Sequence, residues 1–246
     1  KVLRRVLQEL GLTPLQSDAQ VYVWHVEPTG SSTPQGVAST SGMKRLVLIV
    51  STHVDDLKGA GEEPYRRKLL AGLEKEFSTL KVKSGCFECV GVMHDQHPRT
   101  FEVFTHQLHY IPQIKDIPVD AKALVPDEHA ADDDLKQLFM SLVGALAWLT
   151  LTMPSISIYV AFLQRQCQAP VLGHVRRANR LLRWIRRNQK RLGIWFQTLT
   201  PPLRVMTLSD RAFKAQDYQG LVMRGCVILL AELGPSDPKG SALVPN

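Results

Sequence analysis

The 246-residue chain lacks the features that mark several common classes of protein. Its four cysteines are too few for the disulfide framework of a secreted protein, which favours a reducing compartment. It contains no glycine-rich phosphate loop and no Gly-x-Ser-x-Gly element, so neither signature points to an NTPase or a serine hydrolase. The sequence starts at Lys1 without the pattern of a signal peptide, which suggests a piece of a longer chain.

Acidic residues are absent from one long stretch of the sequence. Between Leu135 and Ser209 there is no Asp or Glu, whereas the same stretch holds eleven Lys and Arg residues. This segment carries +11 in a chain whose net charge is +7, so the remainder is net acidic. An asymmetry of this size predicts that one part of the molecule holds a polyanionic partner.

Most of these cations fall on a helix predicted over residues 173–192. Along one face they follow helical spacing: Arg176, Arg180, Arg183, Arg187, Lys190 and Arg191. Like charges one turn apart destabilise a helix unless an anion neutralises them, so we expect this face to bind nucleic-acid phosphates. The alternative is a basic face that is merely solvated. Trp184 and Trp195 have the rings to stack on bases, but we expect both in the core.

An uncharged stretch of 28 residues separates Lys136 from Arg165 and is long enough to span a bilayer. Pro154 lies near its middle, and the stretch also contains several Ser and Thr. These residues favour two buried helices broken at Pro154 over a membrane span. We therefore expect no membrane partner.

Hydrophobic patterning predicts an α+β fold. Helices are expected over residues 1–10, from Glu62 to about 77, from about 135 to 166 with a break at Pro154, and over 173–192. Strands are expected over residues 20–26, 45–52, 80–93, 100–104, 203–208 and 221–230. Loops rich in Gly, Ser, Pro or Asp cover residues 27–42 and 112–134, the second being the expected domain boundary.

Two adjacent carboxylates, Asp55 and Asp56, follow the apolar strand over residues 45–52 and precede Gly59. We expect them at the tip of a hairpin, where a hard cation such as Mg²⁺ would relieve their mutual repulsion. In nucleotidyl transferases such carboxylates hold two metal ions, which activate the primer hydroxyl and stabilise the leaving pyrophosphate. Asp is also common in turns for structural reasons, so the dipeptide alone does not decide between the two.

Six blocks follow one another in an order typical of a single family. They are Leu46–Gly61, Phe77 with the strand at Gly91, Thr105–Tyr110, Leu142–Thr150, Pro170 with His174–Ile185, and Leu208–Asp210. Together they resemble the reverse transcriptase and RNase H region of copia-type LTR retrotransposon Pol polyproteins. The first block resembles that family's Tyr-Val-Asp-Asp hairpin, with His53 where Tyr is usual. The resemblance covers residues 1 to about 231.

The resemblance implies three parts. Residues 1–118 would form part of a reverse transcriptase palm with an antiparallel sheet, residues 119–200 a helical thumb or connection segment, and residues 201–246 the N-terminal hairpin of an RNase H-like domain with a tail. The parent function would be RNA-directed DNA polymerisation with RNase H activity. Its partners would be an RNA/DNA template–primer and the rest of the Pol polyprotein, inside the cell, in a cytoplasmic particle or the nucleus.

The resemblance also assigns residue roles. Asp55 would be a catalytic, metal-binding carboxylate and Asp56 its less critical neighbour, while His53 and Val54 would shape the turn near the primer end. Asp210 would be the first metal ligand of the RNase H site. The cofactor would be Mg²⁺ or Mn²⁺.

The sequence departs from the family pattern at several points. Met153-Pro154-Ser155 stands where Arg-Pro-Asp is usual. The palm's other metal-binding Asp would precede Lys1, and Asp210 is the one RNase H carboxylate that can be matched, so both two-metal sites would be incomplete. Two hypotheses follow: part of a reverse transcriptase that does not polymerise by itself, or a catalytically inactive, basic nucleic-acid-binding remnant.

Overall fold

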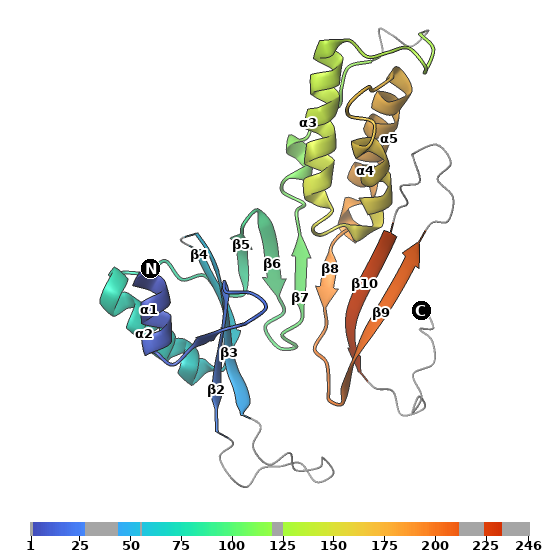
Figure 1. Ribbon diagram of the computed structural model, residues 1–246. Coiled ribbons are helices and arrows are strands. Elements are labelled where there is room, and N and C mark those ends of the chain that lie inside the picture. The colour runs from blue at the N-terminus through green and yellow to red at the C-terminus, as the bar shows by residue number, and fades with distance from the viewer. Residues whose placement is uncertain (1, 28–43, 55, 120–124, 212–223, 233–246) are drawn as a thin grey trace. The chain divides into compact units, whose positions relative to one another are not determined.

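The fold is α+β with antiparallel sheets, as predicted. The computed structural model describes all residues except 1, 28–43, 55, 120–124, 212–223 and 233–246 (Figure 1). The chain divides into two compact units, Lys1–His94 and Asp95–Asn246. The three-part division implied by the resemblance places its boundaries after residues 118 and 200 instead, and that division stays a prediction.

The first unit contains a four-stranded sheet with two helices. Strand order is β1-β2-β3-β4, comprising β1 (Thr13–Pro14), β2 (Val21–Val26), β3 (Arg45–His53) and β4 (Asp56–Gly61). All three pairings are antiparallel. Helices α1 (Val2–Glu9) and α2 (Glu63–Phe77) lie side by side (Figure 1). The strands over residues 20–26 and 45–52 and both helices are thereby confirmed.

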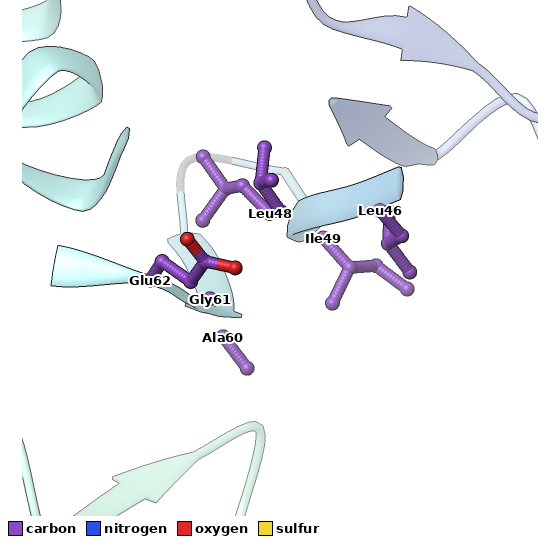
Figure 2. Close-up of a pocket in the computed structure, with 7 residues that line it drawn as sticks. Leu46, Leu48, Ile49, Ala60, Gly61 and Glu62 are labelled. Carbon is purple, nitrogen blue, oxygen red and sulfur yellow. The ribbon is translucent and has the colours of Figure 1, made fainter. Parts of the chain in front are cut away.

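The core of this unit lies between one face of the sheet and the two helices. Tyr22, Trp24, Leu48 and Val50 are buried there with side chains of both helices. The i, i+2 spacing within each pair follows strand alternation, although the neighbouring residues Val23 and Val47 are buried as well. Residues 46–49 of β3 and 60–62 around the end of β4 line a shallow groove of about 320 Å³ (Figure 2).

Helix α2 covers the range predicted for it, from Glu62 to about 77. The backbone N–H of Glu62 donates to the Val47 carbonyl at 2.9 Å, which ties the start of the helix to β3. Leu69 and Leu73 are buried, whereas Phe77 is exposed. Phe77 is the last residue of the helix, and the backbone changes direction at Ser78, whose φ is +65°.

The predicted strand over residues 80–93 is two shorter strands. β5 (Cys86–Cys89) and β6 (Val92–Gln96) are separated by Val90 and Gly91, whose φ angles of +48° and +69° make a tight turn. β6 runs on through residues predicted as a turn. His94 in β6 is buried. Its Nδ1 lies 3.0 Å from the Val92 carbonyl oxygen, and its Nε2 lies 2.6 Å from the Lys58 ammonium nitrogen.

The second unit contains a helical cluster. Its helices are α3 (Asp133–Leu149), α4 (Ser157–Gln164) and α5 (Leu172–Asn188), with short 3-10 turns η1 (Ile111–Gln113), η3 (Pro154–Ile156) and η4 (Gln189–Arg191). The three long helices pack together (Figure 1). An Asp132 carboxylate oxygen accepts the Leu135 N–H at 2.9 Å, and the break at Pro154 is confirmed. In the part of the chain that the structure describes, no helix is both long and apolar enough to cross a membrane.

Helix α5 is fastened to the upstream loop by a buried amide. Asn179 is almost fully buried. Its side-chain amide bonds the backbone of Ile117, 62 residues earlier, as a neighbouring strand would. The Ile117 N–H donates to Asn179 Oδ1 at 2.9 Å, and Asn179 Nδ2 donates to the Ile117 carbonyl at 2.7 Å. The same loop places Ile117 and Ile114 in the apolar core around Phe139.

Two strand pairs complete the second unit. β7 (Val103–His106) pairs antiparallel with β8 (Ile194–Phe196). The sequence pattern did not predict β8. β9 (Leu203–Arg211) and β10 (Arg224–Glu232) form a two-stranded antiparallel ribbon, which confirms both predicted strands with shifted bounds.

Replacing Asn179 by Ala is expected to lower the free energy of unfolding by about 1–3 kcal/mol, because two buried backbone groups of Ile117 lose their partner. The measurement is urea denaturation followed by circular dichroism. The matched control is Asn188→Ala on the same helix, whose Nδ2 donates to the Trp184 carbonyl at an exposed site. Equal losses in the two variants would contradict this role for Asn179.

Candidate functional site

The predicted hairpin at the acidic pair is confirmed for its strands. β3 and β4 stay in register from Leu48 opposite Gly61 to His53 opposite Asp56, so the chain reverses within two residues. Val54 has a φ of +54° and is 87% exposed. Two-residue hairpin turns require a positive φ at their first central position, which a β-branched residue adopts only under strain. Val54 therefore carries the turn geometry, while Asp55 lies outside the described residues.

The tip of this hairpin presents a carboxylate and an imidazole. His53 and Asp56 are directly opposite each other and both exposed. Directly paired residues project from the same face of a sheet, so the two groups share one side of the tip. The geometry brings together His53, Val54 and Asp56 from the predicted set.

Asp56 is suited to a hard cation but cannot hold one alone. Mg²⁺ prefers six oxygen ligands, of which proteins often supply one or two carboxylates beside water and substrate phosphates. Among the residues that the structure describes, no group of three or more His, Cys, Asp or Glu side chains forms a metal-binding cluster. Asp210 lies on β9 opposite Gly225 in the second unit, and its side chain is outside the described part.

The basic helix α5 has one apolar and one cationic side. Ala178, Leu182 and Ile185 are fully buried, whereas Arg180, Arg183 and Arg187 are exposed on the opposite side. Lys190 and Arg191, both exposed, continue the cations through η4. The common exposed face that the spacing predicted is present.

Two arginines of α5 are engaged within the protein. Arg176 forms an ion pair with Asp127 and donates to the Val125 carbonyl at 2.9 Å. Arg186 forms an ion pair with Asp116 and also donates to a loop carbonyl. Sequence reasoning missed both pairs because the acids lie upstream of the acid-free stretch. Arg176, predicted to bind phosphate, is therefore half-buried and anchors the loop, unlike Arg180 and Arg183.

The tryptophans of this region are not core residues, contrary to the prediction. Trp184 is 45% exposed, and on α5 it lies one turn from Arg180 and from Arg187. Trp195 on β8 is 63% exposed. Helical periodicity signalled the exposure of Trp184, because position 184 falls beside the arginine stripe rather than with Leu182 and Ile185. Nothing in the local pattern signalled the exposure of Trp195.

The first turn of α5 depends on His174. Its Nδ1 accepts the Val171 N–H at 3.2 Å, and its ring contacts Phe162 edge-on at 6.1 Å. The Arg177 guanidinium lies 5.6 Å from the centre of the same Phe162 ring. Burial, followed by the charge of Arg177, lowers the pKa of His174 below its ordinary value. A neutral imidazole thus caps the basic helix.

Stability is expected to fall as the pH drops through 6.5, the ordinary pKa of histidine. The unfolded chain binds a proton at His174 more readily than the folded one, and a protonated Nδ1 cannot accept the Val171 N–H. The measurement compares denaturation midpoints of the wild type and His174→Asn, which keeps an acceptor but does not titrate. The wild type should lose more stability on acidification than the variant. Parallel pH profiles would contradict the assignment.

The chain was compared with family models, curated proteins and solved structures, and none of the three comparisons yields a significant match.

Proposed function

We propose that the chain is part of a copia-type RNA-directed DNA polymerase, comprising a section of the palm, a helical thumb or connection segment and the first RNase H hairpin. The observation that carries this proposal is the β3–β4 hairpin, which reverses in two residues at Val54 and presents Asp56 at its exposed tip. An apolar strand leading to paired acids at a strained tip suits a site where carboxylates meet a metal and a primer end.

The elements around the hairpin fit the same proposal. Helix α1 precedes the hairpin in sequence and α2 follows it, and both pack against the sheet. Leu46–Ile49 and Ala60–Glu62 line a groove at β3 and β4 (Figure 2). The long helices α3 and α5 follow, and then the β9–β10 ribbon with Asp210. This order agrees with a palm, a helical segment and an RNase H hairpin.

In this proposal Asp55 and Asp56 would hold Mg²⁺ or Mn²⁺. The metal would lower the pKa of the primer hydroxyl and stabilise the departing pyrophosphate. His53 and Val54 would hold the turn, and thereby the carboxylates, in place. Full two-metal chemistry would require a further carboxylate.

The metal half-site can be tested directly. We expect Mn²⁺ to broaden the backbone amide NMR signals of residues 53–57 before other signals, because a paramagnetic ion bound there relaxes nearby nuclei. Asp55→Asn and Asp56→Asn should each reduce this broadening. The exposed acids Asp133 and Asp134 at the start of α3 serve as an internal control. Broadening that favours the control acids, or that persists in both variants, would count against the proposal.

A second candidate function is binding of nucleic acid without catalysis. The observation that favours it is the exposed stripe Arg180, Arg183 and Arg187, with Lys190 and Arg191 beyond it. A row of exposed guanidinium groups attracts a phosphate backbone, and the affinity falls steeply with salt because counterions are released.

A salt titration of duplex binding tests this function. Each lost phosphate contact should reduce the slope of log K against log salt by about one, so Arg180→Ala with Arg183→Ala should lower it by about two. The matched control is Arg66→Ala with Arg67→Ala on α2, which removes the same charge from residues paired with Glu63. A slope that is flat, or that the control lowers equally, would rule out a specific role for α5.

A further inference from the structure

We propose that Trp195, supported from below by Phe104, is a stacking platform for the bases of single-stranded nucleic acid. The platform lies on the β7–β8 pair of the second unit, and the proposal rests on the nucleic-acid binding put forward above. It names single-stranded nucleic acid as the ligand and assigns the binding surface to Trp195 and Phe104, which the resemblance does not do.

The two rings form a stacked pair across neighbouring strands. Phe104 and Trp195 are register partners, with ring centroids 4.6 Å apart and ring planes 28° from parallel. Trp195 is 63% exposed, whereas Phe104 is partly buried beneath it. One face of the indole is thus occupied by Phe104, which leaves the exposed side to receive another flat ring.

Phe104 is held in place by its surroundings. A Cβ added at Gly193 would lie 2.2 Å from Phe104 Cε2 and 2.3 Å from Cζ, so the phenyl ring occupies the space that any other residue would fill. On its strand, the ring of His106 lies 5.1 Å from that of Phe104. His106 is itself fixed, since Nε2 bonds Asp95 Oδ2 at 2.9 Å and Nδ1 accepts the Leu108 N–H at 3.3 Å. The platform is therefore preorganised, which reduces the entropy cost of binding.

Cations lie close to this platform along the chain. Lys190 and Arg191 are exposed and precede Trp195 by five and four residues, so their backbones lie within about 18 Å of it even in a fully extended chain. Of the acids on the Phe104 side, Asp95 is bonded to His106 and Glu102 accepts the Thr100 hydroxyl at 2.9 Å. Exposed cations four and five residues from Trp195 along the chain suit a phosphate backbone.

This chemistry selects a single strand. In a duplex the faces of the bases stack on one another, so an exposed indole has no base to receive. An unpaired base can stack on Trp195 while Lys190 and Arg191 hold the adjoining phosphates, an arrangement that tolerates any base sequence. Exposed aromatics also occur at protein interfaces, but the neighbouring cations favour a polyanion.

The test measures binding of the complete chain to fluorescent oligothymidylate and to a blunt duplex of equal length. Trp195→Ala should bind the single strand roughly tenfold more weakly, the scale of one lost base–aromatic stack, and leave duplex binding unchanged. Trp195→Phe should retain most of the affinity while losing the quenching of tryptophan fluorescence. The control is Trp148→Ala, an exposed tryptophan of α3, which should change neither affinity. Phe104→Leu should weaken single-strand binding because it removes the support.

The outcomes separate this inference from the proposed function. If Trp195→Ala binds oligothymidylate like the wild type while the arginine variants of α5 still lose duplex affinity, the platform is overturned and duplex binding stands. If the chain binds neither nucleic acid, both are overturned. If sedimentation shows that Trp195→Ala only converts a dimer into monomers, the surface is an interface between copies and the platform is again overturned.

Discussion

Burial of one side of α5 is the constraint on which the second unit depends. Leu172, Val175, Leu182 and Ile185 are fully buried, and each contributes roughly 1.5–3 kcal/mol relative to exposure. This burial fixes the rotation of the helix about its axis. The arginines at helical spacing therefore project from the opposite side of the helix, into solvent. The loop that carries Ile117 is fastened to the same helix through Asn179, and η4 and β8 continue directly from its end. The placement of the cations on α5 therefore follows from a packing requirement.

Features set by local periodicity could be predicted from the sequence. The apolar run that became β3, the break at Pro154 and the arginine face of α5 all depend on residues a few positions apart. The carboxylates at residues 55 and 56 were expected at a hairpin tip, and the strand pairing from Leu48 to Asp56 forms that hairpin. In each case the pattern reports which face a residue turns to the core.

Features that depend on distant partners could not be predicted. The pairs of Arg176 with Asp127 and of Arg186 with Asp116 span 49 and 70 residues. β8 has only three residues, too few for an alternating pattern, and forms because β7, some 90 residues upstream, supplies its partner. The exposure of Trp195 depends on the same pairing, since Phe104 occupies the inner position over Gly193. Non-local contacts, rather than weak local signals, account for these failures.

The β9–β10 ribbon has a consequence for handling the protein in solution. It is a two-stranded sheet of nine paired residues, in which Val205 is 70% exposed and Ile228 is 68% exposed. Isolated two-stranded ribbons are marginally stable in water, and their free edges are templates for strands of other molecules. The ribbon is therefore the place in the second unit where edge-to-edge association between molecules is expected first. The +7 net charge opposes such joining most effectively at low ionic strength.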